Sequence, residues 1–200
     1  MHPSHAFDWD DQAAMLAFVG REAFAHIFTA DNDGLFVVHA PVLVVDGRAQ
    51  FHVSRRNRIA DHLAGRACLM SIAGRHAYQS ANWYVSANQV PTWHYEAVEI
   101  EGVAEPVDET GLTAMLDGLS AVHEGRVQPK RPWTRGKMDE RKFEAMLHAI
   151  VGFEVTPTAI RGTRKFNQHK QSADLQATIR GQAEAGRRDI VQAITELSPE

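Results

Sequence analysis

Cysteine is nearly absent from this chain. Its 200 residues include one, Cys68, so an intrachain disulfide bond is excluded. Cys68 lies within the apolar residues 67–70. We expect a buried and unreactive thiol there, because a buried cysteine behaves as a small hydrophobic side chain.

Long apolar runs are also missing. No stretch approaches the roughly 20 apolar residues that a membrane-spanning helix needs. Residues 1–8 have neither the basic start nor the apolar core of a secretion signal. These two absences together predict a cytoplasmic protein.

An excess of basic charge is the third absence. The chain has 21 lysines and arginines against 25 aspartates and glutamates, and its formal net charge is −4. Proteins that bind DNA electrostatically usually carry a basic face and a high isoelectric point. The charge balance therefore gives direct DNA binding no support, although it leaves a local basic patch open.

Glycine-rich phosphate loops and nucleophile motifs are missing as well, so a Rossmann-type dinucleotide site has no support. The eleven histidines suggest metal binding, but no two are spaced i, i+4 as in a helical zinc motif, and a cysteine pair is lacking. We therefore predict no metal site. The histidines considered as ligands are His39, His52, His62, His76 and His94.

Apolar residues make up 44% of the chain, which is enough for a packed core. Turn signals at residues 31–34 and 46–47 separate stretches of alternating apolar residues, a pattern typical of β-hairpins. The predicted strands are 24–29, 35–45 with an interruption at Pro41, 48–53, 66–73, 92–105 and 152–161. The predicted helices are a first one that Asp8 or Asp10 caps and that runs to about residue 21, 58–63 after Asn57, 107–123 with Asp108 as its cap, 138–149 and a polar tail from 172. Residues 74–92 are predicted to be an ordered loop.

Short antiparallel strands with helices between them and at the ends predict an α+β fold that is mainly antiparallel β. We expect a closed or partly open barrel with peripheral helices, because closure removes exposed sheet edges. Residues 1–170 are assigned to this barrel domain and residues 171–200 to a C-terminal helical extension.

Four clusters contain side chains that could carry chemistry. In residues 51–58, three arginines lie where a strand ends and a predicted helix begins. This arrangement favours the binding of an anion, and the alternative is a solvated basic turn. The aromatic residues of 74–84 and 90–95 are suited to stacking on a planar ring or to a dimer seam, or they pack a loop over the core. Residues 164–170 either close over an anionic ligand or form a surface linker.

These clusters resemble segments of the FMN-binding negative transcriptional regulators of the PaiB type, over residues 7–181. That family is similar to the pyridoxamine-phosphate-oxidase-like split β-barrel flavoproteins. The resemblance implies a homodimer with flavin mononucleotide (FMN) at the subunit interface. The matching segments are 51–57 (FHVSRRN), 76–84 (HAYQSANWY), 90–95 (VPTWHY), 150–154 (IVGFE) and 165–169 (KFNQH).

The resemblance also implies roles for individual residues. The FMN phosphate is expected at Arg55, His52 and Asn57, with Ser54 and Arg58 assisting. Lys165 and Gln168 are expected to reach the phosphate or the ring from the partner subunit. The side chains expected to flank the flavin ring are Trp93, Tyr95 and Tyr78, and the backbone of His39 and Ala40 is expected at the ring edge.

Two departures from the family pattern introduce titratable groups, because His94 and His169 stand where the family has asparagine. The predicted function is that of an FMN-binding regulator that lowers gene expression. An FMN-dependent oxidoreductase acting on a small molecule is the alternative, with His94 and His169 as candidate acid or base. A heme-binding or purely structural dimer is a third hypothesis.

Overall fold

The computed structural model describes residues 1–127 and 129–197 of the chain. Its backbone divides into two compact units. Unit 1 comprises Met1–Asp11, Ala73–Val98 and Arg161–Glu200; unit 2 comprises Gln12–Ile72 and Glu99–Ile160. No helix in the described part of the chain has the length and apolarity needed to cross a membrane.

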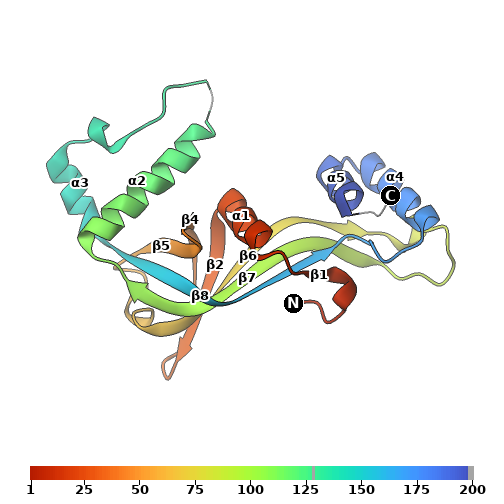
Figure 1. Cartoon of the computed structure of the whole chain (residues 1–200), viewed down its shortest axis with the longest axis horizontal. Coiled ribbons are helices and arrows are strands. Elements are labelled where there is room, and N and C mark those ends of the chain that lie inside the picture. Colours follow the sequence, from red (N-terminus) through yellow and green to blue (C-terminus); the bar gives the residue numbers. More distant parts are fainter. Residues whose placement is uncertain (128, 198–200) are drawn as a thin grey trace. The chain divides into compact units, whose positions relative to one another are not determined.

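Eight strands form one sheet in the order β3-β2-β6-β7-β8-β5-β4, with β1 paired to β8 (Figure 1). Each pairing whose register is defined is antiparallel. Within the described residues the hydrogen-bonded path ends at β3 and β4, so the sheet is not closed as a barrel. The strands are β1 (Asp8–Trp9), β2 (Phe24–Asp31), β3 (Gly34–Pro41), β4 (Leu43–Val45), β5 (Arg48–Ser54), β6 (Arg66–Gln79), β7 (Thr92–Pro106) and β8 (Ile150–Lys165).

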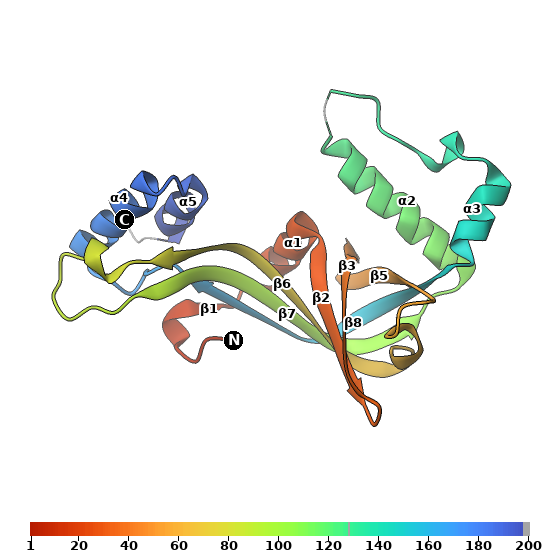
Figure 2. The ribbon, with the colours of Figure 1, turned by 180° about the vertical axis from the view of Figure 1, so that it is seen from behind.

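Five α-helices of the described residues accompany the sheet, which confirms the predicted α+β fold with a mainly antiparallel sheet and peripheral helices. In both ribbon views α2 and α3 lie side by side, as do α4 and α5 (Figures 1 and 2). The helices are α1 (Gln12–Glu22), α2 (Glu109–Gly125), α3 (Glu140–Leu147), α4 (Ser172–Glu184) and α5 (Arg188–Leu197); short 3₁₀ turns are η1 (His5–Phe7), η2 (Ala60–His62), η3 (Ala81–Trp83) and η4 (Arg135–Lys137).

The hairpins of unit 2 follow the predicted turn chemistry. Asp46 and Gly47, between β4 and β5, both have positive φ, at 49° and 77°. Two successive positive φ angles suit the right-handed twist of the flanking strands. Pro41 ends β3, because a proline has no N–H to continue the ladder.

The core of unit 2 is apolar, with the rings of Phe51 and Phe153 stacked at 5.5 Å between centroids. Cys68 is 5% exposed, which confirms the predicted burial, and burial raises the pKa of its thiol to about 11. Helix α2 begins as predicted at the cap Asp108, whose carboxylate accepts from Gly111 N at 2.7 Å. The other large buried side chains include Phe18, Ile27, Met70, Ile72 and Ile100.

Unit 1 has a small apolar core beneath α4 and α5, and its helical tail agrees with the prediction from residue 172 onward. Polar groups are buried beside this core. Gln79 donates to Thr178 Oγ1 at 3.3 Å, and Asn167 donates to the Tyr84 hydroxyl at 2.9 Å. The apolar members are Ala77, Phe166, Leu175, Ile190, Ala193 and Ile194. The predicted boundary between the barrel domain (residues 1–170) and the C-terminal extension (residues 171–200) stays a prediction.

Two local predictions were wrong. Residues 74–79 continue β6, because Ala77 and Gln79 are buried in unit 1 and tertiary packing overrides the local loop signal. The helix expected over 58–63 is only the three-residue η2. The side-chain oxygens of Ser54 and Asn57 accept from Arg56 N and Ile59 N, and such bonds compete with helix formation.

Gly181 offers a test of packing in unit 1. A Cβ there would lie 2.4 Å from the Trp83 ring, whereas a Cβ at Gly20 of α1 would meet nothing within 4 Å. We expect Gly181→Ala to lower the free energy of unfolding by about 1–3 kcal/mol through overpacking. Gly20→Ala should raise it by about 0.5–1 kcal/mol through helix propensity. Urea titration measures both, and a stabilised Gly181→Ala would contradict the packing.

Candidate functional site

The turn that follows β5 is the strongest candidate for an anion site. Ser54, Arg55, Arg56 and Arg58 are exposed, and Asn57 is half-buried. The bonds to Arg56 N (3.2 Å) and Ile59 N (3.2 Å) use only the acceptor oxygens of Ser54 and Asn57. The Ser54 hydroxyl proton and the Asn57 amide protons therefore remain available to a ligand.

Two of the three arginines are fixed by carbonyl oxygens. Arg55 Nε donates to His148 O at 3.0 Å, and Arg58 Nη2 donates to Leu35 O at 2.9 Å. Arg58 also lies over the Phe36 ring, 4.9 Å from its centroid. A guanidinium has five N–H donors, so each arginine retains donors beyond these contacts. The donor set of the turn therefore fits a phosphate group. The other two features predicted to help bind it, a helix dipole and His52, are weaker.

The helix dipole invoked for this turn makes no contribution, because η2 is a single 3₁₀ turn. Two carboxylates also reduce the local positive charge. Asp108 and Glu109 line the same small crevice of about 80 Å³ as Arg55. Charged hydrogen bonds from the arginines are what remains to hold an anion here.

His52, predicted with this turn, points elsewhere. Phe51 and Val53 are buried on one face of β5, so the alternation of the strand places His52 on the other face. It lines a cavity between α2 and α3. Its Nδ1 is buried and has no hydrogen-bond partner in the described part of the protein, and burial lowers its pKa. Its expected contact with the FMN phosphate stays a prediction.

His39 and Ala40 lie on opposite faces of β3. Ala40 is buried, whereas His39 is exposed and pairs across the strands with His26, with 4.5 Å between ring centroids. His39 shares its face with exposed apolar side chains of unit 2. We call these the β2–β3 face: Phe24 and Phe28 of β2, and Leu35 and Val37 of β3.

The predicted ring-flanking residues all belong to unit 1. Trp93 and Tyr78 are 54% and 50% exposed, and their ring centroids lie 6.2 Å apart at 74°. Tyr95 is half-buried. Trp93 and Tyr78 therefore present apolar rings to solvent, a feature suited to stacking on a planar ligand.

Lys165 and Gln168 also belong to unit 1 and are partly occupied by local contacts. Lys165 Nζ donates to Thr92 Oγ1 at 2.8 Å, and burial lowers its pKa. Gln168 accepts from Phe166 N at 2.9 Å and donates to Arg164 O. Gln168 thus closes its own turn, while Lys165 keeps further ammonium protons for a ligand.

The two histidines at family asparagine positions differ in exposure. His94 is completely buried beside Phe166, and desolvation lowers its pKa to about 4. His169 is exposed, with its ring 5.1 Å from that of Phe7. His94 therefore belongs to the core of unit 1, while its neighbour Trp93 faces solvent.

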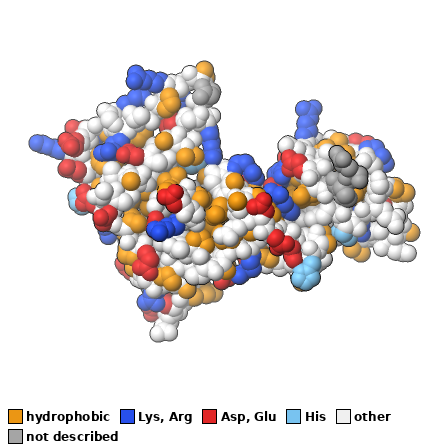
Figure 3. Space-filling model, in the orientation of Figure 1, with side chains coloured by type: hydrophobic (Ala, Val, Ile, Leu, Met, Phe, Trp, Pro, Cys, Tyr) orange, Lys and Arg blue, Asp and Glu red, His pale blue; other side chains and the backbone are white. Residues whose placement is uncertain are grey.

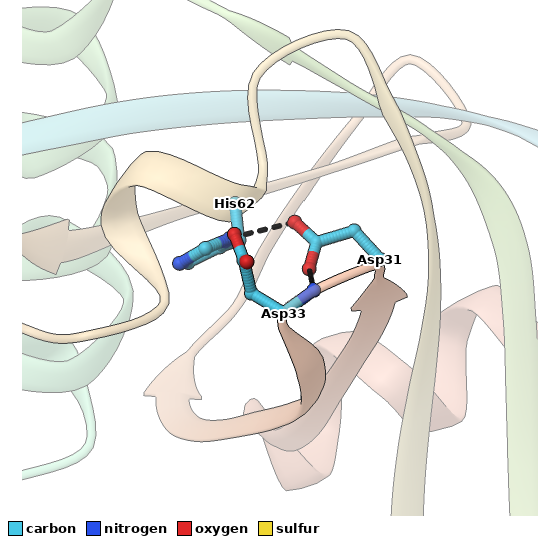
Figure 4. A group of neighbouring side chains, drawn as sticks. All are labelled: Asp31, Asp33 and His62. Carbon is cyan, nitrogen blue, oxygen red and sulfur yellow. Dashed lines mark hydrogen bonds and ion pairs between the residues drawn. The ribbon is translucent and has the colours of Figure 1, made fainter.

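Asp31, Asp33 and His62 bring three potential metal ligands within 4.8 Å of one another (Figure 4). The ligand atoms of Asp31 and His62 are already bonded: the Asp31 carboxylate accepts from Asp33 N at 2.8 Å, and its other oxygen lies 2.6 Å from His62 Nδ1. Arg66 Nη1 is 3.3 Å from the same Asp31 oxygen. The hydrogen bond with His62 lowers the pKa of Asp31. The cluster therefore ties the β2–β3 hairpin to η2.

Charge on the surface is mixed. In Figure 3, lysine and arginine side chains are interspersed with aspartate and glutamate on the face shown. Several basic groups are paired, as in Arg48 with Glu154 at 2.7 Å and Arg135 with Asp117 at 3.1 Å. This face offers no broad basic stripe for a nucleic acid backbone.

The fold is that of known flavoproteins. The flavocytochrome Anf3 of Azotobacter vinelandii superposes with a TM-score of 0.60 at 18% identity, over 82% of this chain and 72% of that one. The FAD and heme binding protein of Mycobacterium smegmatis gives a TM-score of 0.60 at 14% identity, over 79% and 73% of the two chains.

The chain belongs to the family described as "Putative FMN-binding domain", whose model matches residues 1–159. FMN is accordingly its cofactor. A curated relative, protease synthase and sporulation protein PAI 2 of Bacillus subtilis, is 31% identical over 111 residues. These residues are 56% of this chain, and they span about half, 52%, of that relative. The predicted family resemblance is thereby confirmed.

Burial of His94 should make stability depend on pH. The folded state favours neutral His94, so stability is fully present above about pH 6.5 and falls as the pH drops toward 4. Because one pKa unit corresponds to about 1.4 kcal/mol, the loss is on the order of 3 kcal/mol. His94→Asn should remove this loss. Urea titrations of both proteins from pH 7.5 to 4 measure it, and parallel pH profiles would contradict it.

Proposed function

We propose that the protein binds FMN at a homodimer interface and acts as a negative transcriptional regulator of the PaiB type. The single observation that carries the FMN site is the exposed turn of Ser54, Arg55 and Asn57, whose donors are free to meet a phosphate. Bound FMN supplies the redox chemistry of its flavin ring. The turn contributes binding and orientation by charged hydrogen bonds.

The exposed rings of Trp93 and Tyr78 support a place for the flavin ring. Aromatic side chains of this kind bury large apolar area against a planar ligand at small cost in conformational entropy. Lys165 holds an ammonium group on the same unit. We assign Lys165 and Gln168 to contacts with the flavin of the partner subunit. His94 is buried, so we assign it no role in proton transfer.

The β2–β3 face supports a homodimer. Val37 is 45% exposed and lies directly opposite Phe28 in the strand register. Contiguous exposed apolar side chains on a sheet face are typical of protein interfaces. A second copy would bury this face by the same residues on both subunits, as twofold symmetry requires.

The regulatory role rests on likeness to the Bacillus subtilis relative, whose name refers to protease synthesis and sporulation. The negative net charge and the mixed surface charge give direct DNA contact little support. We therefore propose that regulation depends on the flavin state or on a protein partner. The oxidoreductase alternative has no specific side chain in its favour.

Arg55→Ala tests the phosphate site. Only FMN carries a phosphate, so the variant should lose about ten- to hundredfold in FMN affinity and little in riboflavin affinity. Fluorescence titration with both flavins measures this. Arg141→Ala, which removes an exposed arginine from α3, should leave both affinities unchanged. Equal losses of FMN and riboflavin would show that Arg55 does not contact the phosphate.

The same variant tests the regulatory role in cells. In a strain that lacks the gene, transcripts under negative control should rise. Wild-type protein and Arg141→Ala should lower them again, and Arg55→Ala should not. A transcriptome that is identical with and without the gene would refute regulation without affecting the in vitro test of FMN binding.

Val37→Asp tests the homodimer. A carboxylate at position 37 would be buried against the apolar side chains of a second copy at a cost in desolvation, so the variant should be monomeric while the parent is a dimer. Val45→Asp is the matched control, because Val45 is a strand valine of unit 2 with 39% exposure outside this face. Light scattering after gel filtration measures the mass, and a dimeric Val37→Asp would exclude this seam.

A further inference from the structure

A cavity between α2 and α3 in unit 2 is not explained by the FMN site. It has two lobes, an inner lobe of about 240 Å³ and a larger, outer lobe of about 490 Å³. The lobes share several lining residues and therefore adjoin. Trp133, Phe143 and Met146 provide aromatic and thioether surface. The shared residues are Asp117, Ser120, Trp133, Arg135, Met138 and Phe143.

The segment that forms the mouth of this cavity is held in place by its own contacts. Arg135 makes a two-pronged bond to the Asp117 carboxylate, with Nε and Nη2 each 3.1 Å from an oxygen, and lies over the Phe143 ring at 4.9 Å. Trp133 N donates to Glu124 Oε2 at 2.9 Å. Lys137 Nζ donates to Pro132 O at 3.0 Å. A cavity whose wall is already ordered binds a ligand at less cost in entropy.

The inner lobe is lined by a histidine with an unsatisfied nitrogen. His52 lines the lobe with apolar side chains such as Leu147 and Ile150, and its Nδ1 is buried without a hydrogen-bond partner among the described residues. Buried polar atoms in folded proteins are nearly always bonded, so the orphaned nitrogen marks the His52 side chain as a candidate ligand contact. Burial also lowers the pKa of His52, so a neutral imidazole faces the lobe at neutral pH.

Charge in the wall common to both lobes is balanced, because Arg135 and Asp117 neutralise each other, whereas Glu140 lines only the larger lobe. In the inner lobe a charged ligand would have to displace one member of the ion pair and would gain little. The inner lobe is smaller than the roughly 300–1,000 Å³ of sites for drug-sized molecules. Its size, and the rings of Trp133 and Phe143 in its wall, suit one or two aromatic rings.

We propose that this cavity binds a neutral, planar aromatic heterocycle of one or two rings, which hydrogen-bonds to the His52 imidazole and stacks beside Trp133 and Phe143. The ligand enters past the Arg135–Asp117 ion pair. The site is separate from the proposed phosphate turn and does not require bound FMN.

Three one-ring probes of similar size test the ligand class: nicotinamide is neutral, nicotinate is an anion, and benzylamine is a cation. Ligand-observed NMR titration should give saturable binding of nicotinamide to the wild-type protein. Nicotinate and benzylamine should bind at least about tenfold more weakly, because neither charge finds an unpaired partner in the inner lobe. Equal affinities for all three probes would overturn the proposal.

Ser120→Phe tests the location, because Ser120 lines both lobes and the larger side chain fills them. This variant should lose nicotinamide binding and keep FMN binding. Val122→Phe is the matched control on the exposed side of α2 and should keep both. His52→Phe should weaken nicotinamide by roughly two- to tenfold, the value of one neutral hydrogen bond.

Several outcomes would refute the site. Absence of saturable binding to the wild type, or unchanged binding to Ser120→Phe, would show that the cavity is not the site. Displacement of nicotinamide by riboflavin would assign the cavity to the flavin ring instead. A changed oligomeric mass of Ser120→Phe would assign it to a second copy. Because FMN affinity is measured separately, failure of the FMN site is distinguishable from each of these.

Discussion

The alternation of side chains across an antiparallel sheet is the constraint on which the functional assignments depend. On β5 it buries Phe51 and Val53 and turns His52 toward α2 and α3. On β7 it buries His94 and exposes Trp93. A shift of one residue in register would exchange these roles. Adjacent residues in one motif therefore serve different parts of the molecule.

The turn after β5 shows how local hydrogen bonding decides whether a basic segment becomes a helix end or an irregular turn. The side-chain oxygens of Ser54 and Asn57 accept hydrogen bonds from backbone N–H groups, and such bonds compete with helix formation. The result is a compact turn with exposed guanidinium groups and free hydroxyl and amide donors. In the proposed phosphate site, direct charged hydrogen bonds take the place of a helix dipole and depend more strongly on individual side chains.

The two units have interiors of different character. Unit 2 encloses an apolar core that includes Phe51, Phe153 and Ile100. Unit 1 buries polar groups as well, among them Glu96, which lies 2.7 Å from Arg75 Nε and 3.7 Å from Arg164 Nε. A polar interior with directional bonds specifies one arrangement of its members. His94 is desolvated within this interior, where its ring lies beside Phe166.

The sequence alone determined the hairpins, the cap at Asp108, the buried Cys68 and the family whose cofactor is FMN. Each of these follows from neighbouring residues or from motifs in order along the chain. Only the tertiary structure decided that residues 74–79 extend β6, that no helix follows Asn57 and that His52 faces a cavity. Burial beneath α4 and α5, and the closure of α2 over β5 and β8, involve residues far apart in the chain. Local sequence patterns do not predict such long-range packing, because the burial of a side chain depends on which helices and strands pack together.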